Sequence, residues 1–207
     1  RVISPWVVEV DGREISAEKI IIATGARPIV PPIPGLDKVE PLTSENLWQL
    51  DTLPKRLLIV GGGAIGCELA QAFQRLGAQV TLVEMQSQLL PRDDQHVASF
   101  MADCLRADGV QVLTGYAAKQ FSRHADYSSV SLSSEGAEDI EIDFDRVLVA
   151  IGRAANTRGF GLEDLGIPLQ ANGTIATDEY LRTCYPNILA CGDVVGPYQL
   201  THAASHQ

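Results

Sequence analysis

The run Gly61-Gly62-Gly63-Ala64-Ile65-Gly66 has a composition and spacing that suit phosphate binding. Its first, third and sixth glycines give the pattern G-x-G-x-x-G. Residues 57–60 before it form a short apolar run typical of a central parallel strand, and residues 64–76 after it carry apolar side chains at helical spacing. A glycine-rich turn between a strand and a helix is the fingerprint of dinucleotide binding.

Each glycine of the pattern has a physical task. Gly61 permits the tight turn out of the strand, and Gly66 lets the helix pack closely on that strand. Gly63 has no Cβ, so the backbone can approach a pyrophosphate. The free N–H groups at the start of the helix, around Ala64 and Ile65, and the positive end of the helix dipole attract the phosphate charge.

Glu84 supplies a second, independent signal, because it ends the next expected strand, 18 residues after Gly66. A carboxylate there can accept hydrogen bonds from both ribose hydroxyls of the adenosine and repels a 2′-phosphate. No Lys or Arg lies between Glu84 and Leu90. The sequence therefore favours NAD(H) over NADP(H). The alternative is a glycine-rich bend followed by an ordinary surface glutamate.

The composition narrows the classes of protein. Of 207 residues, 45% are hydrophobic and 20% charged, as in globular domains. The net charge of −10 argues against nucleic-acid and anionic-membrane partners, and no apolar run reaches the roughly 18 residues that span a bilayer. Four isolated cysteines indicate neither a metal site nor a disulfide framework, so we expect a cytoplasmic location. The chain shows no nucleophile–base pair, and we assign it no catalytic residue.

The order of expected elements defines the fold class. Strands and helices alternate from residue 57, and a segment of alternating polar and apolar residues at 119–143 predicts a small antiparallel meander. The sequence thus predicts an α/β fold, a three-layer Rossmann-like domain with a parallel sheet and a β-meander insert. The expected strands are 57–60, 79–83, 110–113 and 146–151, the helices 64–76 and 93–107, and the meander strands 119–124, 127–133 and 139–143.

The flanks have a different character. Residues 7–15 predict a hairpin that turns at Asp11-Gly12, and Ile20–Ile22 predicts a buried strand. Four prolines between residues 27 and 35 predict an extended linker, and a short helix is expected to run to Leu50. Residues 153–207 are expected to be loop-like, with a last strand at 188–190.

Several motifs in order resemble the pyridine nucleotide–disulfide oxidoreductases, which include dihydrolipoamide dehydrogenase and mercuric reductase. Ala155 departs from this pattern, because the family usually has proline there. The matching stretches are Ile20-Ile21-Ile22-Ala23-Thr24-Gly25-Ala26-Arg27-Pro28, Gly61 to Glu68, Val149-Ala150-Ile151-Gly152-Arg153 with Asn156, Leu189-Ala190-Cys191-Gly192-Asp193-Val194 and Leu200-Thr201-His202-Ala203-Ala204.

The resemblance implies roles for single residues. Glu68 and Gly152 would lie near the nicotinamide and Ala117 under the adenine. Asp193 would bind the ribityl chain of FAD, Gly25 would allow FAD to approach, and the backbone at His202 and Ala203 would lie at the flavin. Simpler readings remain for four of them. In these readings, Glu68 is a favourable charge near the start of a helix dipole and Gly25 is only a turn glycine. Asp193 caps a helix or turn, and His202 is an ordinary surface histidine.

The resemblance also implies an incomplete enzyme. We expect partial FAD-domain segments at 1–45 and 153–207 around an NAD(H)-binding domain at 46–152. The family's first G-x-G-x-x-G, its C-x-x-x-x-C redox pair and its C-terminal dimer domain do not occur here, so the chain resembles a central fragment of a homodimeric parent. That parent would pass hydride from NADH to FAD and on to a disulfide or related acceptor. The alternative is a standalone NAD-binding or sensing module without catalysis.

Overall fold

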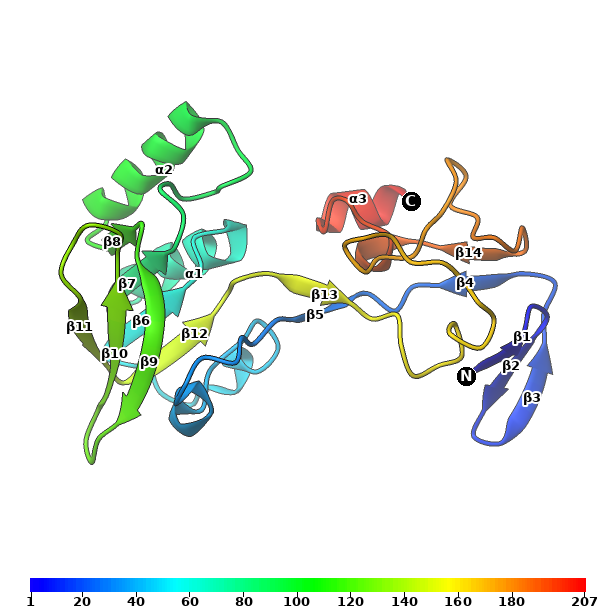
Figure 1. The fold of residues 1–207 in the computed structure, drawn as a ribbon, viewed down its shortest axis with the longest axis horizontal. Coiled ribbons are helices and arrows are strands. Elements are labelled where there is room, and N and C mark those ends of the chain that lie inside the picture. Colours follow the sequence, from blue (N-terminus) through cyan, green and yellow to red (C-terminus); the bar gives the residue numbers. More distant parts are fainter. The chain divides into compact units, whose positions relative to one another are not determined.

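The computed structural model describes residues 1–207, which form two compact units (Figure 1). One unit combines Arg1–Arg27 with Arg153–Gln207, and the other is Pro28–Gly152. The second unit begins earlier than the domain boundary expected at residue 45. The reason is that Leu36, Val39 and Leu42 are buried in its hydrophobic clusters.

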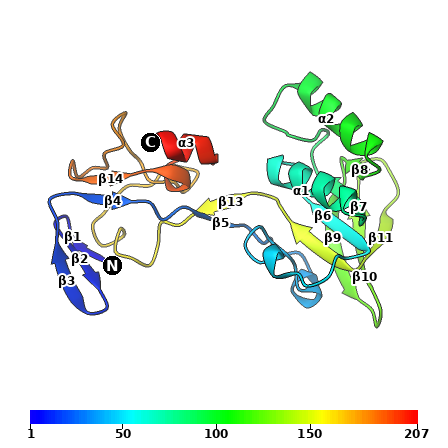
Figure 2. The ribbon, with the colours of Figure 1, turned by 180° about the vertical axis from the view of Figure 1, so that it is seen from behind.

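The second unit is built on a parallel sheet of four strands (Figures 1 and 2). These strands are β6 (Arg56–Val60), β7 (Gln79–Glu84), β8 (Gln111–Thr114) and β12 (Arg146–Val149), in the spatial order β12-β6-β7-β8. β6, which comes first along the chain, therefore lies in space between β7, which comes second, and β12, which comes last. This is the arrangement of one half of a doubly wound dinucleotide-binding fold.

Two helices, α1 (Ala64–Arg75) and α2 (Gln95–Ala107), cover one face of this sheet. Successive side chains of a strand point to opposite faces, so Leu57 and Ile59 of β6 face the helices. From the helices come Cys67, Ala70, Ala102 and Leu105. The second helix starts two residues later than expected, because the side chain of Asp94 caps it by accepting a hydrogen bond from the N–H of His96 at 2.8 Å.

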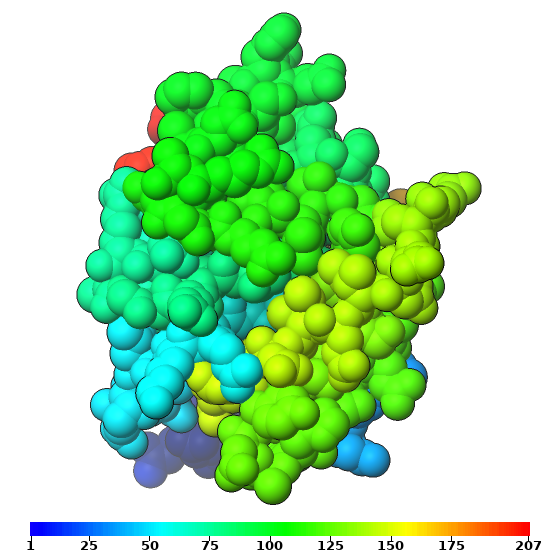
Figure 3. All heavy atoms as spheres, turned by 90° about the vertical axis from the view of Figure 1, so that its left-hand side faces the viewer, coloured from blue at the N-terminus to red at the C-terminus, as the bar shows by residue number.

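The antiparallel meander covers the other face. Its strands are β9 (Ala117–Arg123), β10 (Ser128–Ser133) and β11 (Ile140–Phe144), close to the expected ranges. They pack Phe121, Val130, Leu132 and Phe144 against Leu58 and Val60 of β6. Figure 3 views this unit from one side, where the green atoms of α2 lie above the yellow-green atoms of the meander. Helices, parallel sheet and meander form three layers, which confirms the predicted fold class.

The proline-rich segment differs from the expected extended linker, because it leads into the core of the second unit. It leads into a 3₁₀ helix at Leu36–Val39, and the N–H of Phe121 donates to the carbonyl of Pro34 at 2.8 Å. The short helix expected before Leu50 is only a 3₁₀ turn at Leu47–Gln49. The side chain of Asn46 accepts a hydrogen bond from the N–H of Thr43 at 2.6 Å, which favours a turn in place of a longer helix.

The first unit begins with the predicted hairpin. An antiparallel sheet joins β1 (Val2–Ser4), β2 (Val7–Val10) and β3 (Arg13–Ser16). Asp11 and Gly12, which connect β2 to β3, both have positive φ, at 50° and 74°. Two such residues in a row are the requirement of the two-residue type I′ turn.

Two parallel strands form the centre of the first unit. They are β4 (Ile20–Ile22) and β14 (Ile188–Ala190), and β14 is followed by a 3₁₀ helix at Gly192–Val194. The last element is the short helix α3 (Thr201–His206). Ile20 and Ile22 of β4 are buried, but Ile21 between them is 66% exposed. The strand expected to be buried is therefore covered on one face only, because successive side chains of a strand point to opposite faces.

The chain crosses between the units in two segments, β5 (Ala26–Pro28) and β13 (Arg153–Ala155), which pair as a two-stranded sheet. None of the helices has the length and apolar character that a membrane-spanning segment requires.

Candidate functional site

The glycine turn lies at the carboxyl edge of the parallel sheet, directly after β6. At this point the strand order reverses, because β7 lies on one side of β6 and β12 on the other. In open α/β sheets, ligands bind in the crevice that such a reversal leaves at the carboxyl ends of the strands. The turn therefore occupies the position in this unit that best suits a ligand.

The three glycines of the pattern have different surroundings. Gly61 has φ of +112°, and a Cβ there would collide with the carbonyl group of Ala150. A Cβ on Gly66 would collide with the carbonyl oxygen of Gly61. A Cβ on Gly63, in contrast, would meet nothing within 4 Å. Gly61 and Gly66 are thus required by the fold, whereas the space above Gly63 is open to a ligand.

The amino end of α1 offers unpaired backbone donors. Gly63 is the N-cap residue and provides no side-chain hydrogen bond. The first N–H groups of any helix have no partner inside the helix, and they combine with the helix dipole to attract anions. Ala64 and Ile65, both expected at the pyrophosphate, lie in this first turn. Glu68 follows in the same helix with its side chain exposed.

Glu84 is the last residue of β7 and only 6% exposed. Its Oε2 accepts a hydrogen bond from the N–H of Gly62 at 2.7 Å, and its Oε1 accepts one from the N–H of Gln86 at 2.7 Å. A carboxylate offers about four acceptor positions, so two remain for hydroxyl groups of a ligand. The structure thus brings the Glu84 carboxylate onto the glycine turn.

Gly62 is a residue of the site that the sequence pattern leaves unassigned, since it occupies a variable position of G-x-G-x-x-G. Its N–H donates to Glu84, and its carbonyl oxygen accepts from the N–H of Leu90 at 2.8 Å. The thiol of Cys67 donates to the same oxygen at 3.4 Å. The only available sequence signal was that the middle one of the three consecutive residues 61–63 is also glycine, which the pattern does not require.

Cys67 is a buried thiol below the turn, with 3% exposure. Burial raises its pKa to about 11, and the negative charges of Glu84 and Glu68 add to the effect. Cys67 therefore stays protonated near neutral pH and acts as a hydrogen-bond donor. A thiolate is the form that carries out redox chemistry, so this cysteine is unsuited to it.

Two more residues assigned to NAD lie in the same unit. Ala117 begins β9 and is half-buried. Gly152 has φ of +136°, and its carbonyl oxygen accepts a hydrogen bond from the N–H of Ile29 at 3.0 Å. Neither Ala117 nor Gly152 forms a hydrogen bond with the glycine turn. The N–H of Ala150, two residues before Gly152, donates to the carbonyl oxygen of Val60 at 2.8 Å, and Val60 directly precedes the turn.

The residues assigned to FAD lie in the first unit. Gly25 follows β4 with φ of +66° and open space where a Cβ would point, and Asp193 follows the adjacent parallel strand β14. An oxygen of Asp193 lies 3.3 Å from Nε of Arg153, a partner that the sequence did not predict. In α3, His202 is exposed and Ala203 half-buried. Gly25 and Asp193 thus share the carboxyl edge of two neighbouring parallel strands, which fits a dinucleotide.

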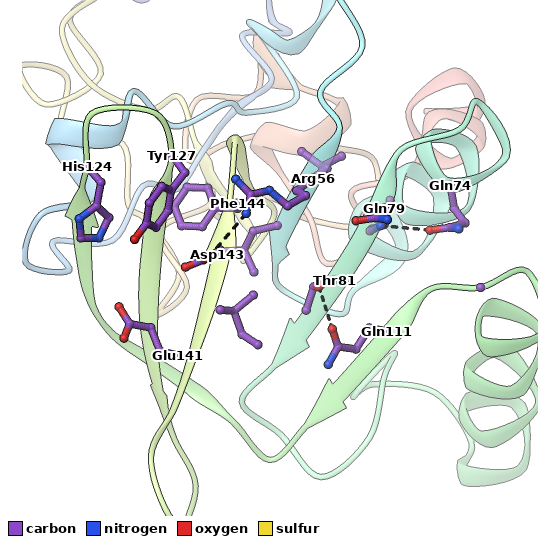
Figure 4. Close-up of a pocket in the computed structure, with 15 residues that line it drawn as sticks. Arg56, Gln74, Gln79, Thr81, Gln111, His124, Tyr127, Glu141, Asp143 and Phe144 are labelled. Atoms are coloured by element: carbon purple, nitrogen blue, oxygen red, sulfur yellow. Dashed lines mark hydrogen bonds and ion pairs between the residues drawn. The ribbon is translucent and has the colours of Figure 1, made fainter.

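A cavity of the second unit lies elsewhere. It has a volume of about 780 Å³ and is lined by Arg56, Gln79 and Gln111, the first residues of β6, β7 and β8. Figure 4 shows these side chains with Asp143 of the meander, 3.7 Å from the Arg56 guanidinium, and with Thr81, which donates to Gln111 at 3.1 Å. This cavity is therefore at the amino edge of the sheet, opposite the glycine turn.

Comparison with known proteins identifies the class. Residues 1–207 match the profile of the pyridine nucleotide-disulphide oxidoreductase family, and the chain belongs to that family. It is 38% identical to a dihydrolipoyl dehydrogenase of Acholeplasma laidlawii, with 97% of this chain and 58% of that protein covered. It is 37% identical to a glutathione reductase of Burkholderia cepacia, with 100% and 45% covered.

A third relative is a mercuric reductase of Staphylococcus aureus, 34% identical over 97% of this chain and 36% of that protein. Among solved structures, the HOCl-induced flavoprotein disulfide reductase RclA from Escherichia coli, as its Cu(II) complex, is similar with a TM-score of 0.86. The two are 37% identical, and 98% of this chain and 46% of that chain are covered. The chain thus spans about half the length of the relatives it matches.

Proposed function

We propose that this chain is the NAD(H)-binding portion of an FAD-dependent pyridine nucleotide-disulfide oxidoreductase. One observation carries the proposal. The open space above Gly63, the uncapped start of α1 and the carboxylate of Glu84 meet at a single turn on the carboxyl edge of the sheet. These are the groups that a pyrophosphate and an adenosine ribose require side by side.

The residues of the turn divide the work of holding the nucleotide. The N–H groups of Gly63, Ala64 and Ile65 bind the pyrophosphate, whose negative charge the helix dipole stabilises. Glu84 accepts hydrogen bonds from the ribose hydroxyls, and Ala117 lies against the adenine. We assign Glu68 and Gly152 to the nicotinamide end on family resemblance.

We further propose that the bound nucleotide is NAD(H). The carboxylate of Glu84 would repel a 2′-phosphate, and the segment from Gln86 to Leu90 contains no cation to neutralise one. A buried carboxylate held by two backbone donors cannot swing away to relieve that repulsion.

FAD would be held in the whole protein by the first unit, where Gly25 and Asp193 end neighbouring strands and His202 and Ala203 begin α3. FAD supplies the capacity to take up hydride and pass electrons on. We propose that the whole protein is a homodimer in the cytoplasm that uses NADH to reduce a disulfide or a related acceptor. The cysteines at 67, 104, 184 and 191 include no C-x-x-x-x-C pair, so we expect this chain alone to be catalytically incomplete.

Titration calorimetry with NADH and NADPH tests the binding function. We expect the chain to bind NADH more tightly than NADPH, and Glu84→Ala to weaken NADH binding and narrow the difference. Glu135→Ala removes an exposed carboxylate of the same unit and serves as the matched control. If Glu84→Ala bound NADH and NADPH with the same affinities as the unaltered chain, Glu84 would not belong to the site.

A second assay tests whether this chain alone is catalytically active. We expect no appreciable NADH-dependent reduction of lipoamide by the purified chain, with or without added FAD. Robust turnover would show that the chain contains a complete electron pathway and would contradict the assignment as an NAD(H)-binding portion.

A further inference from the structure

We infer that Gly62, the middle glycine of the turn, determines nucleotide selectivity by fixing the position of the Glu84 carboxylate. This inference rests on the proposed NAD(H) site and assigns a role to a residue that touches the nucleotide only through Glu84. Gly62 is therefore a positioning residue.

The N–H of Gly62 fixes the position of the negatively charged Glu84 carboxylate. It donates to Oε2 of Glu84 at 2.7 Å, while Gln86 N–H holds the other oxygen at the same distance. Two charge-assisted hydrogen bonds on opposite oxygens fix both the location and the rotation of a carboxylate group. Of the two donors, only Gly62 belongs to the phosphate-binding turn, so it sets the distance between the turn and the negative charge.

The missing side chain of Gly62 makes this contact possible. A Cβ there would lie 2.6 Å from Cδ2 of Leu89 and 2.9 Å from Cβ of Glu84. Leu89 is only 1% exposed and belongs to the core below the helices, so it has little room to yield. Any side chain at position 62 would therefore push Glu84 outward and lengthen its bond to the turn.

Hydrogen bonds to the carbonyl oxygen of Gly62 prevent the backbone of this residue from following a displaced carboxylate. Its oxygen accepts from the N–H of Leu90 at 2.8 Å and from the thiol of Cys67 at 3.4 Å. Leu90 itself has φ of +46°, a conformation that a leucine adopts only when the surrounding structure enforces it. The backbone of Gly62 is thus held on both sides of its Cα.

A displaced Glu84 affects the two nucleotides in opposite ways. NADH loses hydrogen bonds to its ribose hydroxyls, whereas NADPH escapes part of the repulsion between the carboxylate and the 2′-phosphate. A residue that only maintained the shape of the turn would weaken both nucleotides alike, because both carry the same pyrophosphate. The ratio of the two dissociation constants therefore distinguishes the roles.

The test is a double-mutant cycle of Gly62→Ala and Glu84→Ala, with NADH and NADPH dissociation constants measured by calorimetry. We expect Gly62→Ala to narrow the NADPH/NADH ratio by about tenfold, the scale of one hydrogen bond to a charged group. In the Glu84→Ala background it should leave the ratio unchanged, because its effect passes through Glu84. Equal weakening of both nucleotides, or additive effects on the ratio, would overturn the inference.

Two further variants guard against misfolding and general loosening of the turn. Glu84→Gln keeps the size of the side chain but cannot accept from both backbone donors, so it should narrow the ratio without a steric change. Glu135→Ala removes an exposed carboxylate of the same unit and should leave the ratio as it is. A ratio that narrows equally in Glu135→Ala would overturn the inference. If the unaltered chain bound no NADH, the proposed function itself would fail.

Discussion

Arg56 and Asp145 tie the start of the central strand to the end of the meander. Asp145 accepts hydrogen bonds from the backbone N–H of Arg56 at 2.8 Å and from its guanidinium at 2.7 Å and 3.1 Å. The N–H of Asp145 donates back to the carbonyl of Arg56 at 3.0 Å. Residues 89 positions apart are thereby joined where the meander returns to the parallel sheet.

This pair predicts a pH-dependent contribution to stability. Burial alone would raise the pKa of Asp145, but the hydrogen bonds and charge of Arg56 outweigh it and hold the pKa below its usual range. A carboxyl with a lowered pKa in the folded state stabilises above its unfolded pKa of about 3.9, and this stability is lost as the pH falls through the folded value. Asp145→Asn should therefore lower the free energy of unfolding at pH 7 and have a smaller effect near pH 3.

Urea denaturation at pH 7, 5 and 3 measures this difference. Asp143→Asn is the control, because Asp143 is half-exposed and 3.7 Å from the same guanidinium, where ion pairs contribute little. A loss of stability in Asp145→Asn that is the same at all three pH values would contradict the assigned role of the charge.

Gly61→Ala should destabilise the fold. The substitution forces a Cβ into the carbonyl group of Ala150 and a non-glycine residue into φ of +112°. Backbone strain of this kind costs on the order of 1–3 kcal/mol. Thermal denaturation should show a lower Tm even without nucleotide, and an unchanged Tm would mean that the β6 and β12 ends adjust freely.

Gly63→Val should leave the stability unchanged but abolish NADH binding. A Cβ at Gly63 meets nothing within 4 Å, and its φ of −73° is open to any residue, so the Tm should stay within experimental error. NADH binding should be lost, because the branched side chain fills the space assigned to the pyrophosphate. Calorimetry that shows wild-type affinity in this variant would identify the turn as a packing feature only.

The thiol of Cys67 should resist modification and should govern part of the alkaline stability. Its pKa of about 11 exceeds its ordinary value, so the thiolate forms more readily in the unfolded chain. The stabilising contribution is complete below pH 9 and is lost as the pH rises toward 11. Cys67→Ala should therefore flatten the fall in unfolding free energy over this range.

A thiol titration checks the same residue. Ellman's reagent at pH 8 should react rapidly with the exposed Cys184 and with Cys67 only after denaturation. Cys184→Ser should remove a fast-reacting thiol, whereas Cys67→Ala should not. Fast modification of Cys67 in the folded chain would show that the core under the turn opens readily.

The local features of this protein follow from the sequence because they depend on neighbouring residues. The alternation of strand and helix from residue 57 and the two-residue turn at Asp11-Gly12 are each decided within a few positions. The G-x-G-x-x-G spacing belongs to the same class, since a tight turn, a close approach and a helix contact are properties of one short loop.

Features that join distant residues were decided only by the tertiary structure. The extended linker expected at 27–35 leads into the core, because the carbonyl of Pro34 accepts a hydrogen bond from Phe121, a residue of a strand more than 80 positions away. The bond between Gly62 and Glu84 also depends on how β6 and β7 align, which sets the carboxylate over the turn. The sequence by itself therefore determined the kind of site. Packing decided which backbone groups hold it, because a side chain's partners across a sheet depend on register and burial rather than on its neighbours along the chain.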